Sequence, residues 1–323
     1  MSLFKYFFLV IRNIVRNFHY LGKYDLSTKV EQNVPSDYTD LRQSIFQCKK
    51  QIICSYYTIH PLETGKYHEE LNYLNSIDFI DPFPYPTIKK CPKVDVEYDS
   101  KKNKIFVNHN GKKLYLPKGW SKDTATKYYL RFIERENILG GNFTTKTPHQ
   151  YQSKLIHVDN GDIVIDAGAA EGLFALDIIE KAKFVYLFEV NEMWIDALKA
   201  TFEPYKDKVS IISKYLSNMD SKDCTTLSKV LPQTIDESYF IKMDIEGEEE
   251  NVLRACESFL QSNNKIKVSC CTYHRANHEK DIPLFLKSHG FQTEFSDGFM
   301  VFYWDPNLNI PYFRKGLVRA IRH

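Results

Sequence analysis

The sequence predicts an α/β protein built on a mostly parallel sheet, and three observations carry that prediction. From residue 155 onward, short apolar segments alternate with helical patterns, which is typical of a parallel sheet covered by helices on both faces. The segment at 163–174 runs from a β-branched strand through a glycine-containing turn into a helix. The dipeptide Asp297-Gly298 lies between the last two apolar runs and predicts a hairpin, which makes the last strand antiparallel.

The expected strands number seven and are separated by helices. We expect strands at 163–167, 184–189, 208–213, 239–244, 265–272, 291–296 and 299–304. We expect helices near 172–182, 192–202, 225–231, 247–261 and 279–289. Because ligands of such sheets bind at the carboxyl ends of the strands, the candidate site lies there.

The sheet occupies only the second half of the chain, so we expect an N-terminal α+β extension. Residues 147–306 form the predicted main domain, and residues 307–323 form a basic C-terminal tail. In the extension, residues 25–146, alternating segments predict a small β-meander at 94–116 and a helix at 121–139 with Ser121 or Asp123 as its N-cap. Residues 25–93 carry no assignable chemistry, and Asp-Pro-Phe-Pro-Tyr-Pro at 81–86 excludes regular structure.

Residues 1–24 predict a basic amphipathic helix. They contain four basic residues and no acid, and five cationic or histidine side chains fall within an arc of roughly 60°. Aromatic and aliphatic residues occupy the opposite side. Two readings remain open: a helix lying in an anionic membrane interface, or a helix packed on its own domain or across a dimer. The absence of acids favours the membrane reading.

Charge and cysteine content indicate a cytoplasmic protein that does not bind nucleic acid. The formal net charge is +2, and eight basic residues lie at the two termini. The residues between the termini therefore carry a net charge of −6. An acidic body argues against wholesale nucleic-acid binding. The seven cysteines show no metal-binding spacing, which predicts reduced thiols and therefore a cytoplasmic protein. The apolar run at 6–11 is too short for a secretory or membrane segment. Peripheral contact with the inner face of the membrane is compatible with this prediction. The sequence does not indicate the oligomeric state.

The turn after the first sheet strand predicts a nucleoside-bearing cofactor. Its candidate binding residues are Asp166, Gly168, Ala170, Glu171 and Gly172. A dinucleotide fingerprint would require glycines at 170 and 173, where the sequence has alanine and leucine, and this disfavours NAD or FAD. At the end of the second strand stands Glu189, a carboxylate that can accept the two hydroxyls of a ribose.

Two carboxylates follow the fourth strand. Asp244 and Glu246 share a side of the extended chain and suit a general base, a hydroxyl anchor or ligands for a hard cation. The alternative is that the acids at 246, 248 and 249 favour the start of the following helix, a reading that fits Asp244 less easily. His274 ends the fifth strand and is a further base candidate, with a purely structural histidine as the equal alternative.

Three motifs together resemble the FkbM-type methyltransferases, which use S-adenosylmethionine. They are Val164-Ile-Asp-Ala-Gly-Ala-Ala-Glu-Gly-Leu-Phe, Phe188-Glu189 and Lys242-Met-Asp-Ile-Glu-Gly-Glu-Glu249, and Thr147-Pro-His-Gln-Tyr151 is similar to an element that precedes the domain in some members. The resemblance covers roughly 147–303. It implies the Rossmann-like, seven-stranded class I methyltransferase sheet, with the turn at Asp166 to Gly172 around the methionine part of the cofactor and Glu189 on the ribose. It also places Trp194, Ser217 and Asn218 near the adenine.

The resemblance implies O-methylation of a carbohydrate or other polar metabolite, as in surface-polysaccharide or glycolipid synthesis, with Asp244, Glu246 and His274 as the catalytic candidates. In-line transfer from a sulfonium depends mainly on alignment, and a base adds about 10² to 10⁴-fold. Two alternatives remain: a cofactor-binding adaptor without catalysis, and a nicotinamide-dependent oxidoreductase. A divalent cation on Asp244 and Glu246 is the less favoured variant of the site, so we expect no metal.

Overall fold

The computed structural model describes residues 36–85, 93–132, 147–231, 237–263, 265–303 and 308–322. The predicted helix at 1–24 lies outside these ranges. The chain divides into two compact units, residues up to 85 with 299–313, and residues 86–298 with 314–323. The second unit contains every predicted site residue. In the described part of the chain, no helix combines the length and the apolar character that crossing a bilayer requires.

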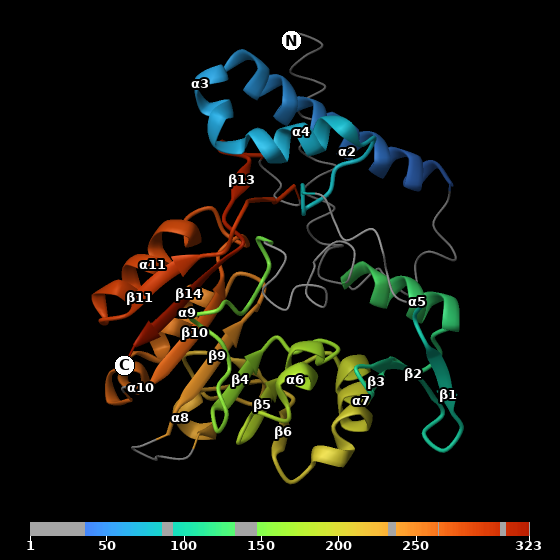
Figure 1. Cartoon of the computed structure of the whole chain (residues 1–323), viewed down its shortest axis with the longest axis vertical. Helices are drawn as coiled ribbons and strands as arrows, with labels where there is room; N and C mark the ends of the chain where they lie inside the picture. The colour runs from blue at the N-terminus through green and yellow to red at the C-terminus, as the bar shows by residue number, and fades with distance from the viewer. Residues whose placement is uncertain are drawn as a thin grey trace. The chain divides into compact units, whose positions relative to one another are not determined.

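A seven-stranded sheet forms the centre of the larger unit (Figure 1), and its strand order is β11-β14-β10-β9-β4-β5-β6. The strands are β4 (Ile163–Ala167), β5 (Phe184–Phe188), β6 (Val209–Ile212), β9 (Tyr239–Met243), β10 (Ile266–Cys271), β11 (Gln292–Phe295) and β14 (Leu317–Arg322). All neighbouring pairs are parallel except the two that involve β14. Six of the predicted strands are therefore confirmed, and so is the mostly parallel sheet.

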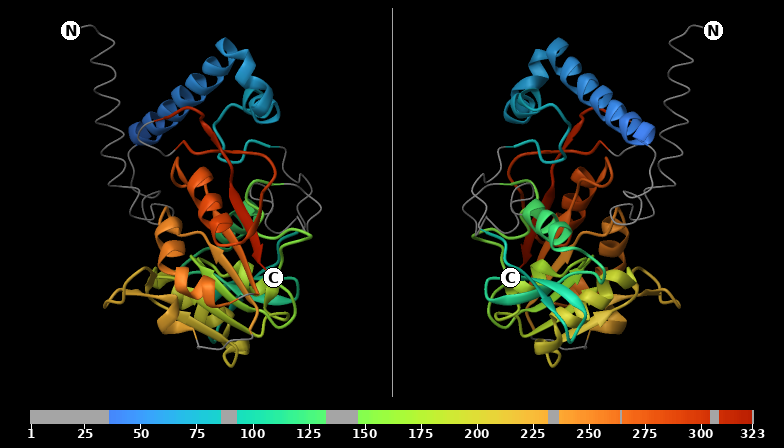
Figure 2. Two further views of the ribbon diagram at one scale, coloured as in Figure 1. Left: turned by 90° about the vertical axis from the view of Figure 1, so that its left-hand side faces the viewer. Right: turned by 90° about the vertical axis from the view of Figure 1, so that its right-hand side faces the viewer.

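Helices cover both faces of the sheet because both faces are apolar (Figure 1; Figure 2). Successive side chains of β4 point to opposite faces, so Val164 joins one hydrophobic cluster while Ile163 and Ile165 join the other. The first cluster includes side chains of α6 (Leu173–Ile178) and α7 (Glu192–Thr201). The second includes side chains of α8 (Leu227–Val230), α9 (Glu249–Ala255), α10 (Glu257–Ser262) and α11 (His278–Ser288). The predicted helices are thus present, and the one expected at 247–261 is divided into α9 and α10.

The predicted meander and the helix after it belong to the same unit as the sheet. The meander consists of β1 (Val96–Asp99), β2 (Lys104–His109) and β3 (Lys112–Tyr115), and α5 (Lys122–Arg131) follows it. Ser121 is the N-cap of α5, since its hydroxyl accepts the Thr124 N–H at 3.0 Å. The Tyr115 N–H donates to Thr201 Oγ1 at 2.9 Å, which joins the meander to α7. The two compact units divide near residue 86, so the meander and α5 lie in the unit that contains the sheet.

The prediction of a closing hairpin at 291–304 is wrong in its second strand. β11 pairs with β14, and β14 inserts between β11 and β10. The apolar alternation at Phe299, Val301 and Tyr303 instead belongs to the core of the smaller unit. A period of two identifies an extended segment but does not name the partner that covers it, and here a distant segment supplies that partner.

Residues 317–322 are consequently not a basic tail. Arg319 is 5% exposed, its Nε donates to Glu294 Oε1 at 2.8 Å, and its Nη1 donates to the Gln150 carbonyl at 2.7 Å. Arg314 donates to the Tyr273 carbonyl at 2.7 Å. Guanidinium groups present five donors and can be buried when those donors are matched. Arg319 therefore ties β14 to β11 and to the segment at Gln150.

The smaller unit is helical with an aromatic core. Its elements are α2 (Ser36–Ile59), α3 (Pro61–Thr64), η1 (Gly65–Tyr67), α4 (His68–Ser76), and β12 (Met300–Val301) paired with β13 (Phe313–Arg314). Ile53 and Tyr57 are four positions apart on α2, so they share one face, and both are buried in this core. Tyr67 stacks on Phe313, with ring centroids 4.8 Å apart. The described residues of this unit carry none of the predicted site residues.

Candidate active site

The sheet brings the predicted site residues of three strands to one edge. β4 lies between β9 and β5, so the segments that follow these strands are neighbours. The Asp244 N–H donates to the Ala167 carbonyl at 3.0 Å, and the Gly168 N–H donates to the Phe188 carbonyl at 3.1 Å. These bonds continue the sheet ladder one residue beyond each strand. The cofactor turn, the Glu189 segment and the Asp244 segment are therefore held in fixed register.

The two glycines of the turn occupy positions where a side chain does not fit. Gly168 has φ +79°, and a Cβ there would lie 1.9 Å from the Asp244 carbonyl oxygen. Gly172 has φ +80° and begins α6; its Cβ would lie 2.5 Å from Leu198 Cδ2. The first glycine allows close approach of two backbones, and the second allows α6 to pack on α7. Both are thus required by the shape of the turn.

Asp166 is held by a lysine that we did not single out from the sequence. The Asp166 side chain is 0% exposed, and Lys242 Nζ lies 2.9 Å from its Oδ1 and donates to the Gly168 carbonyl at 2.6 Å. Burial raises the pKa of the Asp166 carboxyl, and the Lys242 charge opposes this shift. Lys242 interrupts an otherwise apolar buried strand, and that interruption is the signal in the sequence that could have identified it. The pair fixes the cofactor turn onto β9.

Glu189 receives three backbone donors. Its Oε2 accepts the Ala170 N–H, and its Oε1 accepts the Val190 and Asn191 N–H groups, each at 2.8 Å. Ala170 has φ +45°, a conformation that turns its N–H toward this carboxylate. Since a carboxylate offers about four acceptor sites, Glu189 retains capacity for a ribose hydroxyl while it ties the two segments together.

The remaining cofactor candidates, Trp194, Glu171, Ser217 and Asn218, differ in burial and in contacts. Trp194 is 8% exposed and packs against Trp120 and Tyr128, with ring centroids 5.7 and 5.5 Å away, which favours a packing role over contact with adenine. Tyr128 also donates to Glu171 Oε2 at 3.2 Å, so α5 reaches the cofactor turn. Ser217 and Asn218 follow the short β7 (Tyr215–Leu216), which pairs with β8 (Cys224–Thr225), and Asn218 is exposed.

Asp244 is surrounded by donors from distant parts of the chain. The Tyr151 hydroxyl donates to Oδ2 at 2.7 Å, and the Tyr273 hydroxyl donates to Oδ1 at 3.3 Å. His149 Nε2 lies 3.4 Å from Oδ2, and His274 Nε2 lies 3.5 Å from Oδ1. Burial raises the pKa of this carboxyl, yet the hydrogen bond from His149 and the charges of His149, His274 and Lys242 hold the pKa well below its ordinary value. Asp244 is therefore an ionised, fixed carboxylate.

Glu246 and His274 differ in exposure and in charge. The Glu246 side chain is 94% exposed, and its backbone has φ +56°, which a residue with a side chain adopts at a cost. His274 is buried, and although burial lowers its pKa, Glu249, Asp244 and Glu246 raise it to about 9. A histidine charged at neutral pH donates protons and does not accept them. Among the predicted catalytic residues, this leaves the two carboxylates as proton acceptors.

Two groups of described residues have ligand-type atoms within 4.8 Å of one another. They are His149, Asp244 and Cys271, and Asp244, Glu249 and His274. Neither group contains Glu246, so the less favoured variant of the site, a cation held by Asp244 and Glu246, does not correspond to either group. The His274 Nδ1 to Glu249 Oε1 distance of 2.7 Å is a hydrogen bond, and each oxygen of Asp244 accepts one tyrosine hydroxyl.

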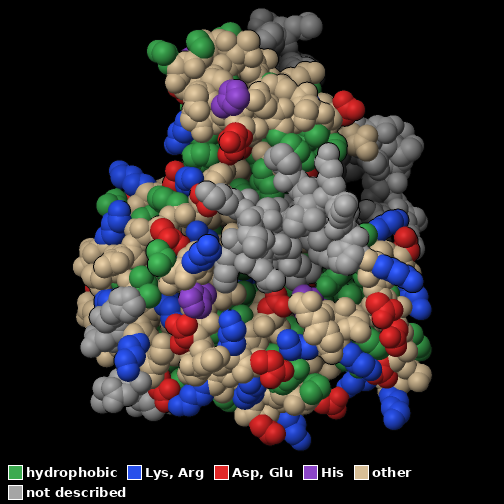
Figure 3. Space-filling model, viewed as in Figure 1, with side chains coloured by type: hydrophobic (Ala, Val, Ile, Leu, Met, Phe, Trp, Pro, Cys, Tyr) green, Lys and Arg blue, Asp and Glu red, His purple; other side chains and the backbone are tan. Residues whose placement is uncertain are grey.

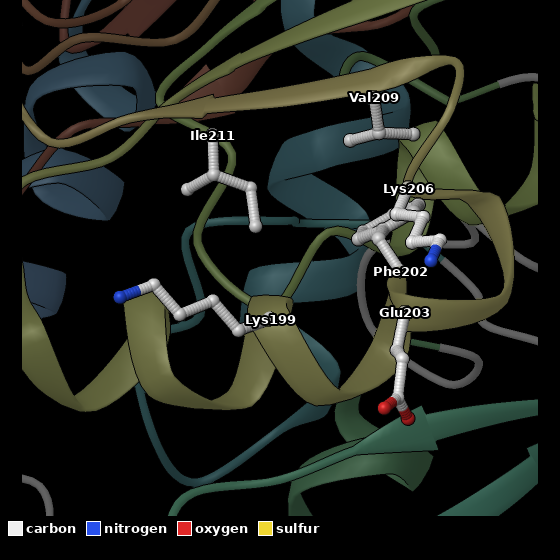
Figure 4. A pocket seen from close by; sticks show the side chains of 6 residues that line it. All are labelled: Lys199, Phe202, Glu203, Lys206, Val209 and Ile211. Atoms are coloured by element: carbon white, nitrogen blue, oxygen red, sulfur yellow. The ribbon is translucent and has the colours of Figure 1, made fainter.

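A cavity elsewhere in the larger unit is not part of this site. It has a volume of about 180 Å³ and is lined by Lys199, Phe202, Glu203, Lys206, Val209 and Ile211 (Figure 4). Val209 is the first residue of β6, and the other lining residues include the last turn of α7. The cavity therefore lies at the amino end of β6, whereas the site residues follow the carboxyl ends of the strands.

Numbered along the chain, the sheet strands lie in the order 6-7-5-4-1-2-3 with strand 7 reversed, and the glycine turn follows strand 1. This is the class I methyltransferase sheet, and S-adenosylmethionine is the cofactor of that class. Residues 217–293 match the family model described as "Methyltransferase FkbM domain". Over these residues the match agrees with the resemblance to the FkbM-type methyltransferases, and together with the sheet it supports S-adenosylmethionine as the cofactor.

Solved structures with a similar fold are distant in sequence. A precorrin-6Y C5,15-methyltransferase from Geobacter metallireducens is 12% identical, with a TM-score of 0.35, over 52% of this chain and 83% of that one. Trm5b from Pyrococcus abyssi is 15% identical, with a TM-score of 0.36, over 71% of this chain and 62% of that one. The 23S rRNA methyltransferase ErmE is 12% identical, with a TM-score of 0.36, over 53% of this chain and 65% of that one. A search of curated proteins gave no match.

Proposed function

We propose that this protein transfers the methyl group of S-adenosylmethionine to a hydroxyl oxygen of a carbohydrate or another polar metabolite. The observation that carries the proposal is the group of Asp244, Glu246 and His274 directly beside the glycine turn. Carboxylates and a charged imidazole pair well with hydroxyl groups, because they supply both acceptors and a donor. The family match and the class I methyltransferase sheet support a methyl donor over a nicotinamide cofactor.

The cofactor is proposed to bind along the turn from Asp166 to Gly172. Gly168, Ala170 and Glu171 line the methionine side, while Glu189 accepts a ribose hydroxyl. Ser217 and Asn218 border the adenine side. The contacts of Glu189 with three backbone N–H groups support this assignment, since they fix its carboxylate next to the turn.

Methyl transfer forms a bond between the acceptor oxygen and the methyl carbon and breaks the bond from that carbon to sulfur. The sulfur takes the electron pair and becomes a neutral thioether, and the hydroxyl proton leaves to a base. We assign the hydrogen bond that orients the hydroxyl to Asp244, because this carboxylate is ionised and fixed by two tyrosines. We assign proton acceptance to Glu246, because its exposed carboxylate can pass the proton to water.

The test is formation of S-adenosylhomocysteine with a panel of sugar and polyol acceptors. We expect Asp244→Asn to lower kcat about 10²-fold or more while the affinity for S-adenosylmethionine stays unchanged. Asp207→Asn, an exposed acid on the connection to β6, serves as the matched control and should retain full activity. Cofactor binding by the wild type without turnover on any hydroxyl acceptor would favour a non-catalytic adaptor.

The acceptor is proposed to be a small molecule or glycan and not a nucleic acid. Lys and Arg side chains are interspersed with Asp and Glu on the face of the larger unit shown in Figure 3. A nucleic-acid surface would require a basic stripe instead. Filter binding with single-stranded and duplex RNA at low salt tests this point. Submicromolar RNA binding together with methylation of RNA would contradict it.

We further propose that the protein works in the cytoplasm and touches the inner face of the membrane through residues 1–24. The four basic residues and the absence of acids in that segment support attraction to anionic lipid. Liposome flotation with and without phosphatidylserine provides the test, with a chain that lacks residues 1–24 as the comparison. Unchanged flotation of the shortened chain would show that this segment is not the anchor.

A further inference from the structure

Three carboxylates surround one histidine beside the cofactor turn. His274 Nδ1 lies 2.7 Å from Glu249 Oε1. On the other side of the ring, His274 Nε2 lies 3.5 Å from Asp244 Oδ1 and 3.8 Å from Glu246 Oε2. Asp244 and Glu246 follow β9, whereas Glu249 is the first residue of α9. The imidazole therefore bridges the two carboxylates assigned to the reaction and a third that lies behind them.

Glu249 is the best shielded of the three. It is 0% exposed, and its Oε1 also accepts the Ile245 N–H at 3.0 Å. His278 Nδ1 lies 3.5 Å from its other oxygen. A carboxylate fixed by the backbone between Asp244 and α9 does not rotate away from His274. It also strongly favours the charged form of the imidazole, because the interaction is little screened by water.

We propose that Glu249 is a positioning residue of methyl transfer: it keeps His274 charged and holds the Nε2–H of His274 between Asp244 and Glu246. This inference rests on the proposed function and adds to it the group that organises the two carboxylates. His274 keeps both of its ring protons throughout the reaction. Its deprotonation would remove the proton on Nε2, because Glu249 holds the one on Nδ1, and a lone pair would then face Asp244.

The other groups around His274 are consistent with this role. The Tyr273 ring lies 4.1 Å from the imidazole, centroid to centroid. From the segment leading into α11, His278 faces the other oxygen of Glu249 at 3.5 Å, and burial lowers the pKa of His278. Arg275 pairs with Glu248 at 2.6 Å. The three carboxylates outweigh burial, since the pKa of His274 is raised to about 9.

The charge state can be measured without any acceptor. In the wild-type protein, we expect the histidine NMR signals of His274 to titrate near pH 9. In Glu249→Gln, which keeps the shape of the side chain, we expect the midpoint to move down toward about 6.5. The matched control is Glu257→Gln, because Glu257 lies 2.9 Å from His289 on the surface, outside the site. The control should leave His274 unchanged.

Turnover gives the second readout. The wild type should have a nearly constant kcat between pH 6.5 and 8.5, whereas kcat of Glu249→Gln should fall about 50-fold over the same range as His274 loses its charge. The affinity for S-adenosylmethionine should not change. A merely structural role for Glu249 predicts a loss of activity that is independent of pH, and that result would overturn the proposal. Glu249→Asp, which keeps the charge, should restore the flat profile.

The two readouts separate failure of this inference from failure of the proposed function. If the wild type methylates no hydroxyl acceptor, the proposed function is wrong, while the NMR titration still decides whether Glu249 keeps His274 charged. If His274 titrates near 6.5 in the wild type, or if Glu249→Gln leaves its midpoint in place, the inference is wrong whatever the turnover.

Discussion

Several residues at the carboxyl ends of the strands have a positive φ, a backbone conformation that residues with a side chain rarely adopt. Gly168, Ala170, Glu246 and Gly247 all have positive φ. For residues other than glycine this conformation costs about 1–2 kcal/mol, so packing around the site must hold it in place. Such positions are frequent where the backbone turns to present groups to a ligand. The site is therefore shaped as much by its backbone as by its side chains.

Gly168 should tolerate no side chain at all. Gly168→Ala should destabilise the protein by about 2 kcal/mol more than Gly161→Ala, because both glycines have positive φ but only the Cβ at 168 meets the Asp244 carbonyl. Urea unfolding measures the difference, and calorimetry should show weakened S-adenosylmethionine binding for Gly168→Ala alone. Equal stabilities of the two variants would contradict the close approach of the turn to the Asp244 segment.

Glu246 separates a backbone effect from a chemical one. Glu246→Gly should be more stable than Glu246→Ala by about 0.5–1 kcal/mol, since glycine relieves the positive φ and alanine does not. Both variants should lose turnover to a similar extent, because both lack the carboxylate. If alanine proved the more stable of the two, the positive φ at this position would not survive in solution.

At the scale of elements, the last strand of the sheet carries the largest structural consequence. β14 lies between β10 and β11, so it completes the sheet on both of its sides. Its Leu317, Val318 and Ala320 are 0% exposed. The chain leaves β11, contributes residues 299–313 to the core of the smaller unit, and returns as β14. The part of the sheet beyond β10 thus depends on residues 317–322.

A buried charge in β14 distinguishes a strand from a tail. Val318→Asp should destabilise the protein by about 4 kcal/mol or more, whereas Met219→Asp, at a position that is 60% exposed, should stay within about 0.5 kcal/mol of the wild type. Chemical unfolding followed by circular dichroism gives both values. If Val318→Asp were as stable as the wild type, residues 317–322 would lie outside the sheet.

At the scale of the whole molecule, the site makes stability depend on pH. His274 has a folded-state pKa of about 9, above its ordinary value near 6.5. Its contribution to stability is therefore fully present below about pH 6.5 and is lost as the pH rises through 9. Asp244, whose pKa is lowered, acts in the opposite direction: its contribution is present above about pH 4 and is lost in acid.

Comparison with a variant isolates the alkaline effect. The free energy of unfolding of the wild type relative to His274→Gln should decline by about 3 kcal/mol between pH 6 and pH 10. Urea unfolding at several pH values provides the measurement. A difference that stays constant over this range would show that His274 is not held in its charged form by the surrounding carboxylates.

What the sequence determined by itself follows from local patterns. The apolar periodicity identified six of the seven sheet strands, the helices between them and the meander, because burial on one or both faces leaves a regular trace in a short window. The same patterns placed Asp166, Glu189, Asp244 and His274 at the ends of strands, which fixed the expected edge of the sheet. The motifs around these residues then indicated the methyltransferase family.

Only the tertiary structure decided which distant groups meet these residues. Tyr151 is 93 positions from Asp244, and Lys242 reaches Asp166 from a different strand. Likewise the seventh strand is β14 and not the neighbouring apolar run, and Glu249, which reads as an ordinary acid at a helix start, holds His274. Long-range contacts leave no period along the chain, because they depend on which complementary surface is available after the sheet has formed.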